Sequence, residues 1–240
     1  MIELAAFLGN PGKEYSRNRH NAGFLLAEKL KFNADLAWQK KFKGLYAALE
    51  RNRLTEYLPC ESGSAGNGSS VGDGGHVGTG GSGLPSRVHF IKPLTFMNLS
   101  GECVSQAASF FKIKTGAILV VHDELELPLG TVSLKFGGGL GGHNGLRSMK
   151  ASFGNADFWR IRIGIGRPDS RLPGEGGPEG SGEGIVDWVL SDFNREEAEV
   201  MDRVLEAGAE LLNRALVNDP ESLLPEWAKK RVPVNGSSPA

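Results

Sequence analysis

Short apolar runs alternate with stretches of helical spacing along most of the chain. Buried strands are predicted at 2–8, 45–49, 88–91, 117–121, 132–136 and 158–165. Helices are predicted at 22–31, 104–111, from about 146 to 153 and from 195 to about 216. Asn194 precedes Glu197 by three residues, which is the spacing of a capping box at the start of the last helix. This order predicts one α/β domain over 1–231, with a twisted mixed β-sheet covered by helices on both faces.

Two internal segments lack the apolar residues needed for packing. Residues 61–84 and 170–184 consist mostly of glycine, serine and other small polar residues, and we expect disordered surface insertions there. The last residues, 232–240, are predicted to form a flexible tail.

The composition is that of an ordinary globular protein, with 240 residues, 40% of them hydrophobic, and a net charge of −1. Any contact with RNA must therefore come from a local patch, because no global basic field is present. Cys60 and Cys103 lack paired spacing and suit reduced thiols, which predicts a cytoplasmic location. The start of the chain is interpreted as a strand and not a signal peptide, and no segment is apolar for long enough to span a membrane.

The glycine-rich run 137–145 is the most distinctive segment, because it ends in His143-Asn144-Gly145 directly before a predicted helix. A flexible linker is the common interpretation of such runs. The flanking apolar segments favour a site loop instead, since free N–H groups at a helix start bind phosphate or carbonyl oxygens.

Polar clusters follow three predicted strands, where α/β sheets place their sites. They are 9–21, 92–98 and 122–126. His20 changes charge near neutral pH, as a general base must, although a lone histidine more often packs or caps. Asp123 directly follows a buried strand and is its best acidic partner, whereas Glu124 and Glu126 lie further into a loop.

Activated water is favoured over a covalent nucleophile, because the chain has no Gly-x-Ser-x-Gly motif. The histidines are scattered without ligand spacing, so no metal and no cofactor are expected. Asn10, Asn98 and Asn144 each lie in a loop marked by glycine or proline, where one asparagine would mean only a turn. Three together suggest carboxamides that bind a peptide-like backbone or an oxyanion.

Five motifs in the same order closely resemble the bacterial peptidyl-tRNA hydrolase family. They lie at 9–23, 92–101, 122–130, 137–148 and 160–168. The departures are modest: Phe96 stands where tyrosine is usual, Asn18 replaces a common threonine, and the insertion at 61–84 is longer than is typical.

The resemblance implies hydrolysis of the ester between a peptide and tRNA, which recycles tRNA from peptidyl-tRNA released by ribosomes. His20 would be the general base, Asp123 would hold it, and Asn10 would contact the substrate near the ester. The remaining implied contacts are those of Tyr15, Phe96, Asn98 and Asn144 with the peptidyl and acceptor end, and of Lys135 and Arg162 with a backbone phosphate. The resemblance further implies a monomer without a membrane or an obligatory protein partner. His143 is expected to shape its loop.

Two alternatives stay open. Relatives in plant organelles serve as RNA-splicing partners, so a non-catalytic RNA-binding role is one of them. It is disfavoured because His20, Asp123 and the three asparagines occur together. A general esterase acting on small N-acyl esters is the other, and the basic residues Lys135 and Arg162 argue against it.

Overall fold

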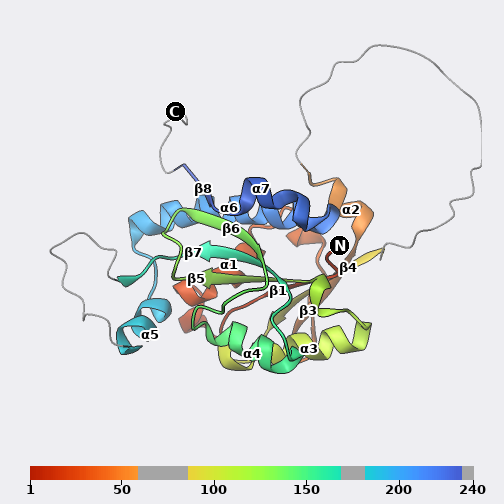
Figure 1. Cartoon of the computed structure of the whole chain (residues 1–240), viewed down its shortest axis with the longest axis horizontal. Helices are drawn as coiled ribbons and strands as arrows, with labels where there is room; N and C mark the ends of the chain where they lie inside the picture. Colours follow the sequence, from red (N-terminus) through yellow and green to blue (C-terminus); the bar gives the residue numbers. More distant parts are fainter. Residues whose placement is uncertain (59–85, 169–181, 234–240) are drawn as a thin grey trace, which may run out of the picture.

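The computed structural model describes residues 1–58, 86–168 and 182–233, which form one sheet and the helices packed on it (Figure 1). The sheet has eight strands in the order β2-β3-β4-β1-β5-β7-β6-β8. Strands β4, β1, β5 and β7 run parallel, and the remaining pairs are antiparallel. The strand bounds are β1 Leu4–Phe7, β2 Gln39–Lys41, β3 Gly44–Glu50, β4 Arg87–Pro93, β5 Ile118–Glu124, β6 Thr131–Phe136, β7 Trp159–Gly164 and β8 Lys230–Arg231. The predicted mixed sheet is confirmed.

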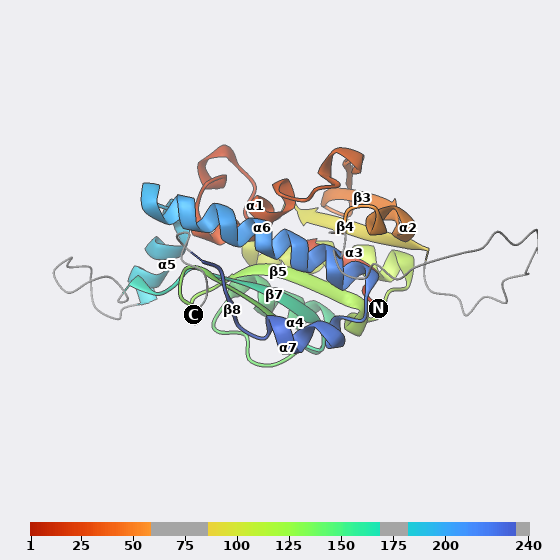
Figure 2. The same cartoon turned by 90° about the horizontal axis from the view of Figure 1, so that it is seen from above.

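Helices cover both faces of this sheet, as predicted (Figure 2). Helices α3 (Ser100–Phe111) and α4 (Asn144–Phe153) pack against each other on one face, over Ile118 and Val120 of β5. The other face, which carries Leu119 and Val121 of β5, packs against the remaining helices. These are α1 (Ala22–Glu28), α2 (Arg51–Thr55), α5 (Gly182–Leu190), α6 (Arg195–Val217) and α7 (Leu224–Trp227). Every residue of β5 is buried, and each large apolar side chain buried there contributes about 1.5–3 kcal/mol.

The element ends differ from the predictions in several places. The strand predicted to end at residue 121 continues through Glu124, so Asp123 lies within it, and the helix predicted from 104 begins at Ser100. The capping box of Asn194 and Glu197 is confirmed at the start of α6. Strand β2 is polar and exposed along its whole length, which is why the apolar pattern did not predict it.

The predicted insertion 61–84 and residues 170–181 of the second one lie outside the described residues, as does 234–240 of the predicted tail. The structure differs from these predictions at residues 182–184 and adds a backbone contact at residue 232. Residues 182–184 begin helix α5, and the N–H of Val232 donates to the carbonyl of Gly130 at 2.8 Å, which extends the pairing of β8.

Two glycines allow backbones to approach closely at the edge of the sheet where the parallel strands end. A Cβ on Gly101 of α3 would lie 2.2 Å from the carbonyl oxygen of Ser148 in α4, and the Gly101 N–H donates to the Ser148 hydroxyl at 2.9 Å. A Cβ on Gly23 would lie 2.4 Å from the carbonyl oxygen of Leu8. Helices α3, α4 and α1 are therefore held at fixed positions around this edge.

Candidate active site

One carboxylate contacts two histidines at the carboxyl end of β5. Asp123 lies on β5, His20 lies on the short 3-10 helix η2 (Arg19–Asn21) before α1, and His143 caps α4. The His20 Nδ1 atom is 3.0 and 3.1 Å from the two carboxylate oxygens of Asp123, and the Nε2 atom of His143 is 3.0 Å from Oδ1. The predicted pair of His20 and Asp123 is thus in contact, and His143 joins it.

Hydrogen bonds determine the proton positions on both histidines. The Nδ1 atom of His143 accepts the N–H of Gly145 at 3.1 Å, so its Nε2 carries the proton and donates to Asp123. His20 donates from Nδ1 to the ionised Asp123, which leaves the lone pair on its Nε2.

The charges of this group shift the pKa values of its members in opposite directions. Burial lowers the pKa of His20, but the adjacent Asp123 carboxylate outweighs burial and raises it above 6.5. Burial would raise the pKa of Asp123, but His20 and His143 hold it well below its usual range. Asp123 is therefore ionised, and His20 is a stronger base than a free imidazole.

His20, Asp123 and His143 are also the group whose atoms could meet a metal ion within the described ranges. The geometry opposes this use, because the Nε2 atom of His143 bears a proton as long as its Nδ1 accepts from Gly145. A metal at that atom would require loss of the cap of α4.

Asn10 is held from both ends. Its Oδ1 atom accepts the N–H of Met97 at 2.8 Å, while its backbone exchanges two hydrogen bonds with the side chain of Asn21, at 2.7 and 3.0 Å. Among the residues that the structure describes, none accepts a hydrogen bond from the carboxamide NH₂ of Asn10, which is left for another partner. Asn21 was missed as a functional residue, although its place beside His20 in the same polar cluster was a signal.

The other predicted carboxamides lie at helix starts. Asn98 is on the 3-10 helix η4 (Met97–Leu99), Asn144 is the first residue of α4, and both are exposed. The rings of Tyr15 and Phe96 meet edge to face with centroids 6.5 Å apart, and Phe96 is 57% exposed. The loop after β1 and the loop after β4 therefore meet, while the contact of these side chains with substrate stays a prediction.

Lys135 and Arg162 lie on paired strands, β6 and β7, on the same face of the sheet. The Lys135 side chain is exposed, whereas the Nε atom of Arg162 is paired with Glu124 at 3.0 Å and is largely buried. Arg162 is thus less available than the sequence suggested. Arg160, which was missed, donates to the carbonyls of Gly137 and Gly139 and holds the glycine loop on the sheet.

Arg19, which no sequence pattern indicated as a site residue, fixes the segment that carries His20. Its side chain is 2% exposed, and its guanidinium donates to Ser191 and Asp192 and pairs with Glu197 at 2.5 Å. It also stacks 3.7 Å above the ring of Trp188 in α5. The segment that carries His20 is therefore tied to α5 and to the start of α6.

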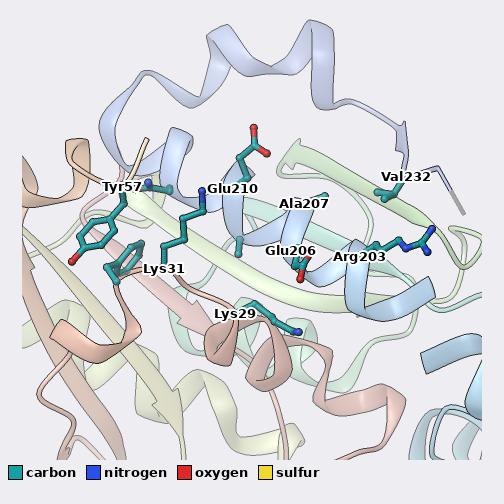
Figure 3. Close-up of a pocket in the computed structure, with 11 residues that line it drawn as sticks. Lys29, Lys31, Tyr57, Arg203, Glu206, Ala207, Glu210 and Val232 are labelled. Carbon is teal, nitrogen blue, oxygen red and sulfur yellow. The ribbon is translucent and has the colours of Figure 1, made fainter. Parts of the chain in front are cut away.

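A pocket of about 540 Å³ lies elsewhere, between the end of α1 and helix α6 (Figure 3). Lys29 and Lys31 line one side, and Arg203, Glu206 and Glu210 of α6 line the other. None of the predicted site residues is among its lining residues.

Comparisons with known proteins give one consistent result. The model of the family described as peptidyl-tRNA hydrolase matches residues 4–61 and 64–234. A curated peptidyl-tRNA hydrolase of Treponema pallidum is 41% identical over 234 residues, covering 96% of both chains. A crystal structure of a peptidyl-tRNA hydrolase with N-propanol is 29% identical, with a TM-score of 0.70 over 100% of this chain and 97% of that one. The Acinetobacter baumannii peptidyl-tRNA hydrolase is 30% identical, with a TM-score of 0.65 over 94% and 91%. Within the described residues, no helix is both long enough and apolar enough to cross a membrane.

Proposed function

The chain belongs to the peptidyl-tRNA hydrolase family, and from this premise we propose that it hydrolyses the ester between a peptide, or an N-blocked amino acid, and tRNA. This activity would recycle tRNA from peptidyl-tRNA released by ribosomes. The observation that carries the proposal is the contact of His20 with the buried Asp123, beside the anchored carboxamide of Asn10.

His20 acts as the general base. Its Nε2 atom accepts a proton from a water molecule as the oxygen of that water attacks the ester carbonyl carbon. The imidazolium formed is stabilised by the Asp123 carboxylate. When the tetrahedral intermediate collapses, the bond to the ribose oxygen breaks and His20 returns the proton to that oxygen. General-base assistance of this kind accelerates a reaction by about 10²–10⁴-fold.

Asn10 supplies the polar contact nearest the ester. Because Met97 occupies its oxygen, its NH₂ group is the part directed to substrate, and an N–H donor stabilises a developing oxyanion or a peptide carbonyl. Asn10 would thereby help to distinguish blocked from unblocked aminoacyl-tRNA. No metal is required in this mechanism, because His20 activates the water.

The substrate is bound on both sides of this centre. Asn98, Asn144, Tyr15 and Phe96 contact the peptidyl and terminal-adenosine end. Lys135 binds a backbone phosphate of the tRNA, and Arg162 does so while paired with Glu124. Phosphate contacts position the RNA, and the centre selects the ester.

The test is release of N-acetyl amino acid from N-acetyl-aminoacyl-tRNA, compared with unblocked aminoacyl-tRNA, in the presence of a chelator. Cleavage of the blocked substrate alone, lost in a folded His20→Ala variant, is the expected result. No cleavage by the wild type would favour the RNA-binding alternative. If a small N-acetyl amino acid ester were cleaved as fast as N-acetyl-aminoacyl-tRNA, the general esterase would be favoured.

A further inference from the structure

The hairpin that joins β2 to β3 has an unusual turn. Phe42 and Lys43 have φ angles of 55° and 60°, in the left-handed region that two-residue hairpin turns require and that asparagine and glycine normally occupy. Such a conformation persists in other residues only where the surroundings fix it, and it is concentrated at functional sites. Here the ring of Phe42 contacts Tyr46, Phe110 and Phe111, with centroids 5.4–5.7 Å apart.

This turn presents lysines to an open groove of about 480 Å³. The groove, called the hairpin groove below, is lined by Lys40, Lys41, Lys43, Gly44, Leu94 and Thr95. The Lys41 ammonium lies 4.3 Å from the ring centre of Phe110, and Lys43 pairs with Glu102 at 2.8 Å, so both charges are held in place. Three cations and one neighbouring carboxylate leave the groove positively charged.

The hairpin groove lies at the same edge of the sheet as Asp123. Gly44 pairs with Pro93 at the carboxyl end of β4, and the N–H of Leu94 donates to the carbonyl of Lys43 at 3.0 Å. Strands β3 and β5 are separated by three strand spacings, which amount to roughly 14 Å. An extended peptide covers that distance in roughly four residues.

Exposed apolar side chains follow β4, the strand that pairs with β3 of the hairpin at this edge of the sheet. Leu94, Phe96 and Leu99 belong to the loop and helix start after β4, and all three are exposed. Lys135, the proposed phosphate contact, lies on β6, on the other side of β5 in the sheet order. With the tRNA bound toward Lys135, as proposed, the β4 side of the centre is left for the peptide, and the hairpin groove lies on that side.

We propose that the hairpin groove binds acidic side chains of the peptide part of the substrate, about four to five residues from the ester. The proposal rests on the proposed function and adds a preference for substrates whose peptide carries acidic residues at these positions. Charge complementarity to the lysines and the exposed apolar side chains after β4 support a peptide as the occupant.

The experiment compares three substrates that share one tRNA and one esterified residue. They are N-acetyl-aminoacyl-tRNA, hexapeptidyl-tRNA with aspartate at the fourth and fifth residues from the ester, and the same hexapeptidyl-tRNA with asparagine there. The variant is Lys40→Glu, on the exposed strand β2. The control is Lys114→Glu, an identical charge change on an exposed residue before the amino end of β5.

Lys40→Glu should lower kcat/KM for the aspartate peptide roughly fivefold, mainly through KM, and spare the other two substrates. Lys114→Glu should change none of them. An equal loss of kcat/KM on all three substrates would mean that the groove contacts RNA, and this would overturn the proposal. An unchanged kcat/KM for the aspartate peptide would overturn it as well. Failure of the proposed function is separately visible, because wild-type protein would then cleave none of the three.

Discussion

The Nε2–H of His143 donates to Oδ1 of Asp123 at 3.0 Å, while the Nδ1 atom of the same ring accepts the N–H of Gly145. One side chain therefore caps helix α4 and orients the carboxylate that holds the candidate base. The glycine loop and the end of β5 are connected by this contact. A rotation of the His143 ring would break both interactions at once.

Replacing His143 by asparagine separates these two roles. Asparagine can cap a helix but is too short to reach Asp123, so His143→Asn should retain the fold and lose the donor to the carboxylate. We expect kcat to fall about tenfold, the usual magnitude for a hydrogen bond to a charged group. The acid limb of kcat/KM should move to higher pH, because the Asp123 charge then acts on His20 alone. An unchanged pH profile would contradict this role.

The pH dependence of hydrolysis should follow the ionisation of His20. Asp123 raises the pKa of His20 above 6.5, so kcat/KM should rise with pH through a value above 6.5 as the imidazole loses its proton. In Asp123→Asn no carboxylate opposes burial, which lowers the pKa of His20. The acid limb of the kcat/KM profile should therefore move below pH 6.5. The plateau should fall by on the order of a hundredfold, because the imidazolium loses its counter-ion. Profiles of both proteins on N-acetyl-aminoacyl-tRNA test this, and a limb that does not move would remove Asp123 from the mechanism.

The oxygen and the NH₂ group of the Asn10 carboxamide can be tested separately. Asn10→Asp keeps the oxygen that accepts from Met97 and loses the NH₂ group, whereas Asn10→Ala loses both. Asn10→Asp also places a negative charge at a buried position, so its free energy of unfolding should fall by about 1–3 kcal/mol, and kcat/KM should fall roughly tenfold or more. Urea denaturation and hydrolysis of blocked and unblocked substrates measure the two effects. If Asn10→Asp were as active as wild type, the NH₂ group would not contact the substrate.

Arg19 should matter for both stability and activity. Arg19→Met leaves the carboxylate of Glu197 without its buried partner and should lower the free energy of unfolding by about 3 kcal/mol. The His20 segment would be less firmly held, so kcat should also fall at temperatures where the variant is folded. Arg17→Met is the matched control, since Arg17 is exposed in the same segment and only weakly paired with Asp192. Equal effects of the two substitutions would contradict the buried role of Arg19.

The sequence predicted the strands and helices whose apolar spacing is regular, and it located the polar clusters at the strand ends. It did not predict β2, because an edge strand made of glutamine and lysines has no buried face to leave an apolar pattern. It also missed Arg19 and Arg160, since both act through partners that are distant in sequence, at Ser191 and in the glycine loop. His143 was expected only to shape its loop, because nothing in the local sequence indicates that it reaches a carboxylate 20 residues earlier.

The contact between Gly101 and Ser148 sets the spacing between the helix starts that carry Asn98 and Asn144. In the proposed site, the width of the opening between Asn98 and Asn144 would thus be set by a residue that lies outside the substrate contacts. Any side chain at 101 would push α3 away from α4 and separate the two carboxamides without altering either. Attempts to admit bulkier acyl groups should therefore begin at this helix contact, and surveys that consider only residues near the ester would overlook it.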